Sequence, residues 1–218
     1  MTLPRTFSAS TLGHAWEISV MGLLHDPSAL LVDSVTGGPA RELECVQLIV
    51  EDPQREPRVS SHYVLPELIE DYSSLFTPYA STRPKDAATI ADRIYGWRSG
   101  KRTIDQVDAV ISELRDRPHS RRAVMSFWDP AEDLVALDGT PLGHCMAWMS
   151  VREEALNMAL VSRSVDAWLG AVPNMIAFTG LMHTVAAKLD LAIGSYTQFI
   201  FSYHIYVRDL PSARRALG

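Results

Sequence analysis

The chain has 218 residues, 21% of them charged, and a formal net charge of −6 at pH 7. This length fits one domain, 1–218, which can bury about two thirds to three quarters of its unfolded surface in a single core. The acidic balance argues against a nucleic-acid partner, because a general nucleic-acid surface needs a basic excess. Its apolar runs are shorter than the ~20 residues of a membrane span, and the N-terminus lacks the basic and apolar regions of a secretory signal. We therefore expect a cytoplasmic protein with no membrane partner, in which Cys45 and Cys145 are free thiols.

Three elements are predicted in the first fifty residues. Apolar residues at helical spacing indicate a helix over Thr11–Leu24, with Ser10 or Thr11 as its N-cap and Asp26-Pro27 as its stop. A turn signal at 36–39 is followed by a short apolar run, 45–50, that predicts a strand.

Helices are predicted in the middle of the chain. A polar, proline-containing loop over 54–61 precedes a weak helical pattern over 65–76. A further helix is predicted over Pro84–Tyr95, with these residues facing inward: Ala87, Ile90, Ala91 and Ile94. The clearest pattern starts at Thr103-Ile104-Asp105-Gln106, which has the form of a capping box, and Pro118 ends it. Its apolar stripe consists of Ile104, Val107, Val110, Ile111 and Leu114.

The C-terminal half is richer in strands. Strands are predicted over 123–128, 145–151 and 156–161, the last two joined as a hairpin, and over 196–207. Pro173 begins a long apolar helix that runs to about Leu189, and Gly194 ends the connection after it. Five or so strands and several helices without regular βαβ repetition predict an α+β domain, with one mixed sheet covered by helices.

Several polar groups can bind or react with a ligand. Arg121 and Arg122 follow a helix end and can hold an anion bidentately, although a solvated basic pair is the simpler interpretation. Asp166 and Asn174 flank the start of the long helix, where a cap or a first-turn polar residue is equally expected. His204 and Tyr206 are two residues apart on a strand, so they face the same side.

The pair His144-Cys145 does not form a local catalytic dyad. Adjacent residues of a strand point to opposite faces, and a buried inert cysteine is the default interpretation of Cys145. The histidines and cysteines show no metal-ligand spacing, so no metal is expected. There is also no glycine-rich phosphate loop or nucleophile elbow. The residues by themselves predict an α+β domain with a phosphate site.

The order of these groups resembles the thymidylate synthase superfamily, which includes pyrimidine-nucleotide hydroxymethylases. The resemblance runs from Thr103 through Pro118-His119-Ser120-Arg121-Arg122 to Trp128, and from His144 to His204-Ile205-Tyr206. It covers about half of the chain densely. It implies a thymidylate synthase-like fold and one-carbon transfer to C5 of a pyrimidine nucleotide.

The resemblance also implies a role for each group. Arg163 and Ser164 would bind the nucleotide phosphate within one subunit, and Arg121 and Arg122 would reach the phosphate of the neighbouring subunit in a homodimer. His204 and Tyr206 would hold the sugar hydroxyl. Asn174 would bind the pyrimidine edge, as in members that take uracil, and His144 would polarise the ring carbonyl through water. Asp166 and Gly170 would lie beside the cofactor, 5,10-methylenetetrahydrofolate, and Tyr95 fits the family order near the catalytic centre.

The chain departs from the family pattern at the nucleophile. The family has Pro-Cys-His, whereas this chain has Gly143-His144-Cys145. Residues 143 and 145 face the same side of an extended strand, so Cys145 can replace the missing thiol. Asp33-Ser34-Val35-Thr36-Gly37 stands where the family has a phosphate-binding arginine, for which Arg41 is a substitute, and the tryptophan pair of the folate pocket is absent before Tyr95.

Three hypotheses follow from this pattern. The first is a methyl- or hydroxymethyltransferase in which a Cys145 thiolate adds to C6 of the pyrimidine. The second is the same fold acting on another one-carbon acceptor without a covalent step, with His144, Tyr95 or Asp166 as acid–base groups. The third is a nucleotide-binding homologue without catalysis.

Overall fold

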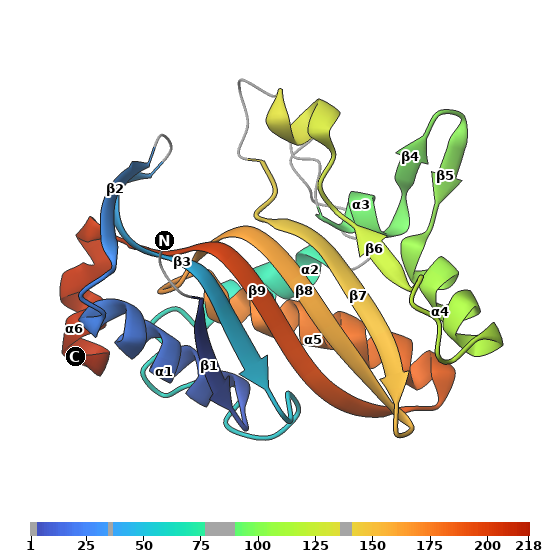
Figure 1. Ribbon diagram of the computed structural model, residues 1–218, viewed down its shortest axis with the longest axis horizontal. Helices are drawn as coiled ribbons and strands as arrows, with labels where there is room; N and C mark the ends of the chain where they lie inside the picture. The colour runs from blue at the N-terminus through green and yellow to red at the C-terminus, as the bar shows by residue number, and fades with distance from the viewer. Residues whose placement is uncertain (1–3, 35–36, 77–89, 136–140) are drawn as a thin grey trace.

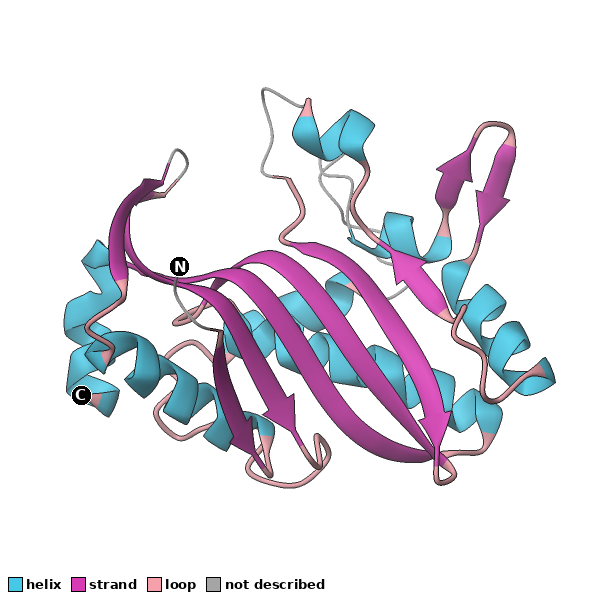
Figure 2. Ribbon diagram, in the orientation of Figure 1, coloured by secondary structure: helices cyan, strands magenta, loops and turns pink. Residues whose placement is uncertain are grey.

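A mixed seven-stranded sheet forms the centre of the protein in a computed structural model that describes residues 4–34, 37–76, 90–135 and 141–218 (Figure 2). The strand order is β1-β3-β9-β8-β7-β6, and β2 pairs with β3. Two neighbouring pairs are parallel, β1 with β3 and β8 with β9, and the others are antiparallel. The strands are β1 (Arg5–Ala9), β2 (Leu30–Ser34), β3 (Gly38–Val50), β6 (Val124–Ser126), β7 (His144–Arg152), β8 (Ala155–Asp166) and β9 (Ala192–Tyr206). A separate hairpin is formed by β4 (Trp97–Ser99) and β5 (Arg102–Ile104).

Helices cover one face of this sheet. Figure 1 shows α2 and α5 behind the strands, α1 and α6 side by side at one end, and α3 and α4 beyond β6 at the other. The helices are α1 (Leu12–His25), α2 (Glu67–Leu75), α3 (Ile90–Tyr95), α4 (Gln106–Asp116), α5 (Ala171–Leu189) and α6 (Leu210–Leu217). The predicted α+β class, a mixed sheet covered by helices, is thus confirmed. Within the described ranges, none of these helices is long and apolar enough to cross a membrane.

The long helix α5 is the main cover of the sheet. Its sequence is apolar on nearly all faces. Pro173 fits in its first turn, because backbone nitrogens there make no intrahelical hydrogen bond and proline has no N–H to leave unpaired. Phe178 is fully buried and contacts the rings of Phe76, Phe127 and His144 at centroid distances of 4.7, 5.6 and 4.8 Å. The helix ends at Asp190, which adopts the left-handed conformation (φ 56°), whereas Gly194 lies inside β9. The prediction that Gly194 ends the connection was therefore wrong.

The first helix, α1, is tied to the end of β8. Thr11 is the N-cap, as predicted, because its hydroxyl accepts a hydrogen bond from the His14 backbone N–H. The buried Trp16 indole donates to the Ala167 carbonyl (2.8 Å) and stacks on Trp168, with ring centroids 5.3 Å apart. This anchor fixes the turn that follows β8, where several predicted site residues lie.

Helix α4 differs from its predicted start. Asp105 is the N-cap and accepts from the Val107 and Asp108 N–H groups, so the predicted capping box beginning at Thr103 is wrong. Ile104 belongs to β5 and is 38% exposed, so it is not part of the buried stripe. The Gln106 side chain instead bonds the backbone of Arg93 and Ser126, joining α3 to β6.

Other predictions meet the described ranges only in part. The hairpin over 151–155 is confirmed, with Glu153 and Glu154 at positive φ in its turn. The sheet has more strands than the predicted five, since β1 and β2 add to it. Ile90, Ala91 and Ile94 of α3 are buried as predicted, whereas Pro84, Ala87 and the turn residue Thr36 lie outside the described residues.

A line of irregular pairing crosses the sheet. A β-bulge separates His144 from Met146 in β7, and the β8–β9 ladder passes from Ser162↔Ile200 to Ser164↔Ser202 without pairing the residues between them. In β3 the residue at the same level is Cys45, which has φ 56°. The irregularities lie beside the predicted site and break the simple alternation of side chains there.

Candidate functional site

Parallel pairing of β8 with β9 brings two groups of predicted site residues together. Ser164 pairs with Ser202, and Asp166 pairs with His204, so the C-terminal ends of the two strands lie at the same edge. His144 pairs with Ser162 and joins them from β7. Residues that are up to sixty positions apart in sequence therefore form one site.

His144 lies at the centre of this site. It is buried, its Nδ1 is 2.8 Å from the Ser162 hydroxyl, and its Nε2 is 2.9 Å from Oδ1 of Asn174. Burial lowers the pKa of His144 from its usual 6.5 to about 4, the Asn174 hydrogen bond opposes this shift, and the positive charge of Arg163 adds to it. The imidazole is therefore neutral near pH 7.

Asn174 links His144 to the turn before α5. Its Nδ2 donates to the Gly170 carbonyl at 2.8 Å, and the Gly170 N–H donates to the Asp166 carbonyl. The Asp166 carboxylate accepts from the N–H groups of Trp168 and Leu169 in the turn before α5. The N-cap of α5 is Gly170 without a side-chain bond, so the prediction that Asp166 caps the helix was wrong. Burial raises the pKa of Asp166, and these two backbone bonds counter the rise. Asp166, Gly170 and Asn174 thus form one rigid turn beside His144.

Arg163 is held by the segment that enters β7. Its Nε donates to the Leu142 carbonyl (2.9 Å), and its Nη2 donates to the Pro141 carbonyl (2.7 Å). The guanidinium lies 5.3 Å from the centroid of the Trp128 ring. In this arrangement Arg163 positions residues 141–143, with its side chain half-buried beside the site.

The backbone at Ser164 leaves no room for a side chain at residue 143, where the family has its nucleophile. The Gly143 carbonyl accepts from the N–H groups of Arg163 (2.8 Å) and Ser164 (3.4 Å). A Cβ atom at residue 143 would lie only 2.8 Å from the Ser164 carbonyl oxygen. Real Cβ atoms do not approach an oxygen so closely, so a side chain at this position requires the backbone to move.

Cys145 is the thiol nearest to this closed position. It is the extra residue of the β7 bulge, so the expectation that residues 143 and 145 share one face of an extended strand does not apply. Burial raises the pKa of the Cys145 thiol, and the Asp133 carboxylate adds to the rise. The backbone N–H and the charge of Arg163 act in the opposite direction. The thiol is therefore protonated near pH 7.

His204 and Tyr206 extend the site along β9. Their rings meet edge to face with centroids 5.0 Å apart, and His204 Nδ1 is 3.5 Å from the Ser164 hydroxyl. The spacing argument that placed them on one side of the strand fits this contact. Arg208 lies next to them, with its guanidinium 4.5 Å from the Tyr206 centroid and Nη1 donating to the Gly37 carbonyl.

Arg208 was not selected from the sequence. The only signal was its position two residues beyond Tyr206, in a 3₁₀ turn, η2 (Val207–Asp209), which was predicted in part as strand. Arg41, the suggested substitute for the phosphate arginine, instead donates to the carbonyls of Leu23 and Asp26 at the end of α1. Arg208 is thus the arginine that contacts the loop where the family pattern has its phosphate ligand.

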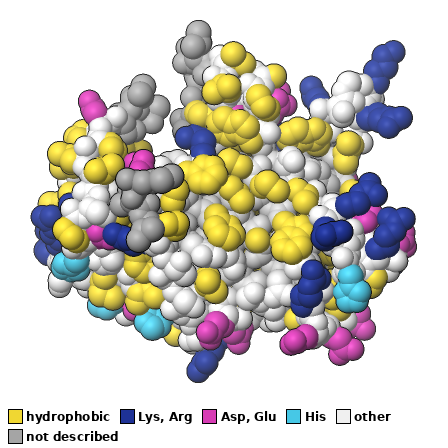
Figure 3. All heavy atoms as spheres, viewed as in Figure 1, with side chains coloured by type: hydrophobic (Ala, Val, Ile, Leu, Met, Phe, Trp, Pro, Cys, Tyr) yellow, Lys and Arg dark blue, Asp and Glu magenta, His cyan; other side chains and the backbone are white. Residues whose placement is uncertain are grey.

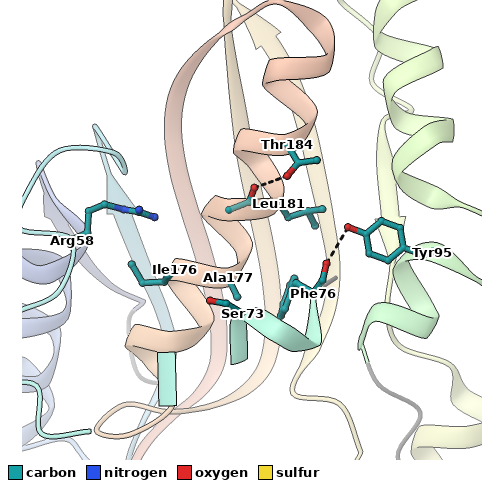
Figure 4. Close-up of a pocket in the computed structure, with 9 residues that line it drawn as sticks. Arg58, Ser73, Phe76, Tyr95, Ile176, Ala177, Leu181 and Thr184 are labelled. Atoms are coloured by element: carbon teal, nitrogen blue, oxygen red, sulfur yellow. Dashed lines mark hydrogen bonds between the residues drawn. The ribbon is translucent and has the colours of Figure 1, made fainter. Parts of the chain in front are cut away.

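Tyr95, at the end of α3, lies beside a pocket that residues of α2 and α5 line. Its hydroxyl donates to the Phe76 carbonyl at 3.0 Å, and burial raises its pKa. It lines a pocket of about 260 Å³, shown in Figure 4, with these residues: Arg58, Ser73, Phe76, Ile176, Ala177, Gly180, Leu181 and Thr184. Tyr95 is linked to His144 indirectly, through its bond to the Phe76 carbonyl and the contacts of the Phe178 ring with Phe76 and His144.

Arg121 and Arg122 are separated from the site of their own chain. Both are exposed, and the Met149 N–H donates to the carbonyl of the next residue, Ala123. This contact lies five residues along β7 from His144, a distance of roughly 16 Å at the usual rise of a strand. Neither guanidinium has a hydrogen-bond partner within the ranges that the structure describes.

A buried ion pair beside the site was also not predicted from the sequence. Arg93 and Asp133 have side chains only 7% and 6% exposed, and their charged atoms are 3.2 Å apart. Asp133 also accepts from the N–H groups of Asp129 and Leu142, and Arg93 donates to the Phe127 carbonyl. The helical phase of α3, which places Arg93 beside Ile90 and Ile94, was the available signal.

Within the described ranges, no group of three or more histidine, cysteine or acidic side chains is arranged to hold a metal ion.

Comparison with known proteins agrees with this geometry. A family model described as Thymidylate synthase matches residues 78–218. A thymidylate synthase of Symbiobacterium thermophilum is 36% identical over 151 residues, which cover 61% of this chain and 52% of that protein. The chain therefore spans about half the length of this curated relative. Fold and matches define a thymidylate synthase-like α+β protein. The chain belongs to the thymidylate synthase family.

Proposed function

We propose that the protein transfers a one-carbon unit to C5 of a pyrimidine nucleotide, by methylation or hydroxymethylation, as a specialised member of its family. The observation that carries this proposal is the contiguous site formed by His144, Asn174, Ser164 and His204 in a chain of this family. Polar groups that can recognise a base, a sugar and a phosphate all lie at one edge of the sheet.

Each residue of the site binds a different part of the nucleotide. Arg163 and Ser164 bind the phosphate, and the buried His204 and the half-buried Tyr206 hold the sugar hydroxyl. Asn174 binds the pyrimidine edge, and the neutral His144 acts on the ring carbonyl through water. Arg163 must then exchange part of its bonding to the 141–142 carbonyls for the phosphate.

The turn at Asp166 and Gly170 suits the folate cofactor. The Asp166 carboxylate uses Oδ1 for the turn, and a carboxylate oxygen is a suitable acceptor for the N–H groups of a pterin ring. A Cβ at Gly170 would lie 3.2 Å from the Asp166 carbonyl oxygen, so glycine suits this tight turn. When bound here, 5,10-methylenetetrahydrofolate supplies the one-carbon unit.

The open face of the sheet supports a homodimer. Phe199 and Phe201 alternate with the buried Gln198 and Ile200 of β9, so they lie on the face opposite α5, and they are 41% and 55% exposed. Figure 3 shows hydrophobic side chains gathered over this face and basic side chains along one side of it. A second copy on this surface would cover the apolar patch, and Arg121 and Arg122 would reach the phosphate of its site.

Cys145 is the proposed nucleophile, which would add to C6 of the pyrimidine. Its raised pKa means that the proton must leave the thiol before the addition, and the nearby Arg163 charge favours the resulting thiolate. Replacing Cys145 by serine should abolish turnover. Cys45→Ser is the matched control, because Cys45 is exposed on β3 and lies outside the site.

The raised pKa of Cys145 and the closed backbone at Gly143 favour a second candidate function. In this alternative, His144, Tyr95 or Asp166 acts as an acid–base group on a different one-carbon acceptor, with no covalent step. Full activity of Cys145→Ser would exclude covalent catalysis by this thiol and select the alternative.

The central experiment measures exchange at C5. The protein is incubated with dUMP, UMP, dCMP or CMP labelled with tritium at C5, with and without 5,10-methylenetetrahydrofolate, and released tritium is counted. Release from one nucleotide that depends on the protein is the expected result. No release from any of the four, combined with measurable phosphate-dependent binding, would point to a non-catalytic nucleotide-binding homologue.

A further inference from the structure

A continuous chain of buried polar side chains connects β9 to Asn174. The Tyr196 hydroxyl donates to Oε1 of Gln198 (3.0 Å), and Nε2 of Gln198 donates to the Ser162 hydroxyl oxygen (2.9 Å). Ser162 contacts His144, and His144 contacts Asn174, as described above. Tyr196, Gln198 and Ser162 are at most 1% exposed, so water does not replace these bonds.

The hydrogen bonds at both ends of the chain are compatible with one direction of hydrogen bonding. At one end, the Gly170 carbonyl can only accept, so the Asn174 amide nitrogen faces Gly170 and its oxygen faces His144. His144 Nε2 must then carry the proton, and Nδ1 must accept from Ser162. At the other end, Ser162 receives a hydrogen from Gln198, so its own hydrogen is free to point to Nδ1. The two arguments agree without a conflict at any bond.

The direction determines what Asn174 offers to a ligand. Its Oδ1 accepts from His144, one hydrogen of Nδ2 goes to Gly170, and one Nδ2 hydrogen remains. A donor at this position pairs with a carbonyl oxygen on the base and not with an exocyclic amino group. Burial lowers the pKa of His144 to about 4, so the imidazole carries a single proton near pH 7, as this arrangement requires.

We propose that Gln198 and Ser162 are positioning residues: acting through His144, they hold the Asn174 amide so that it presents an N–H group to a 4-oxo pyrimidine nucleotide. Neither residue touches the base itself. The proposal rests on the proposed function for its ligand, whereas the orientation of the chain is a property of the protein alone.

The first test needs no ligand. In protein labelled with ¹⁵N-histidine, the imidazole nitrogen shifts distinguish the Nε2–H from the Nδ1–H tautomer, and the His144 signals are assigned by their loss in His144→Asn. We expect Nε2–H in the wild type and a larger Nδ1–H fraction in Ser162→Ala and in Gln198→Met, in which only the bond from Asn174 to Gly170 still favours Nε2–H. Methionine keeps the size of the Gln198 side chain but has no donor. Nδ1–H in the wild type would overturn the proposal.

The second test measures base selection by the equilibrium binding of UMP and CMP. Loss of one oriented hydrogen bond should reduce the UMP/CMP affinity ratio roughly five- to tenfold in Ser162→Ala and Gln198→Met. Ser162→Thr keeps the hydroxyl and should restore the ratio, and Ser150→Ala, which removes a buried hydroxyl from β7, should leave it unchanged.

The outcomes separate this proposal from the proposed function. An unchanged ratio in both network variants, with a changed tautomer, would overturn the role of Gln198 and Ser162 in base selection. Failure of the wild type to bind any pyrimidine nucleotide would overturn the proposed function and this role with it, whereas the tautomer result stands independently. Thermal unfolding of each variant identifies a loss of binding that comes only from unfolding.

Discussion

Two regions of the site differ in how their residues are held: the polar groups on β8 and β9, and the segment that enters β7. On one side, the Ser162 hydroxyl contacts His144 and Gln198, and the Ser164 hydroxyl contacts His204. On the other side, the segment before β7 brings Gly143 against Ser164 and leaves the Cys145 thiol protonated. The binding groups are thus maintained by their own hydrogen bonds, independently of the position of the reactive group. The comparison teaches that recognition and reaction are separable here.

The largest effect is expected from breaking the anchor of the second region. Asp133→Ala removes one partner of the buried pair with Arg93 and also frees the Leu142 N–H. The variant leaves the buried Arg93 paired only with the exposed Glu132, so the free energy of unfolding should fall by about 3 to 5 kcal/mol, the scale of a broken buried pair. Urea denaturation measures this change. Glu132→Ala is the control, because Glu132 is 61% exposed and its bond to Arg93 is worth about 1 kcal/mol or less.

Acid should weaken the first region through His144. The pKa of this group is about 4 in the folded protein and near 6.5 in the unfolded chain, so the unfolded state binds the proton first. The contribution of His144 is complete above pH 6.5 and declines as the pH falls towards 4, with a total of at most about 3 kcal/mol. The stability difference between wild type and His144→Asn should therefore shrink over this range. A difference that stays constant from pH 6.5 to 4 would contradict the assignment.

Arg163 joins the two regions, so its removal should affect both. Arg163→Ala is expected to weaken nucleotide binding about 10- to 100-fold, which is the scale of a lost charge-assisted hydrogen bond. Isothermal calorimetry with UMP measures the loss, and inorganic phosphate as competitor shows whether it concerns the phosphate. Arg115→Ala on the exposed face of α4 should bind as the wild type does.

The smallest effect concerns the closed position itself. Gly143→Ala places a Cβ 2.8 Å from the Ser164 carbonyl, and such overpacking should cost about 1 to 3 kcal/mol of stability. Gly143→Cys should be destabilised similarly, so it should not simply restore a family-type nucleophile. Gly180→Ala is the control, because its Cβ would meet no atom within 4 Å. This variant should raise the free energy of unfolding by about 0.5 to 1 kcal/mol, since alanine is favoured over glycine inside a helix. Equal stability of both alanine variants would show that the backbone at residue 143 can shift with little loss of stability.

Local sequence signals predicted the elements that depend on local chemistry. The cap at Thr11, the hairpin after Val151 and the apolar helix after Gly170 all rest on neighbouring residues, and the structure has each of them. The resemblance assigned Ser164 and His204 to one nucleotide, and parallel pairing of β8 with β9 brings these two residues within 3.5 Å.

Features that depend on pairing between distant residues could not be predicted in this way. The β7 bulge, which cancels the alternation argument for Cys145, arises from pairing with β8. The partners of Arg163 lie twenty-one and twenty-two residues away, and those of Arg93 lie thirty-four and forty residues away. No spacing rule connects such residues before the chain has folded. The same holds for β1 and β2, whose short sequences give weak strand signals and which form by pairing with β3.

The line of irregular pairing across the sheet has a consequence for thiol chemistry. Cys45 in β3 and Cys145 in β7 both lie on this line, but β9 and β8 stand between their strands. Three strand spacings separate the two residues by roughly 14 Å, about twice the largest Cα separation that a disulfide spans. Oxidants should therefore modify each sulfur separately, and any disulfide that forms should join different molecules through the exposed Cys45.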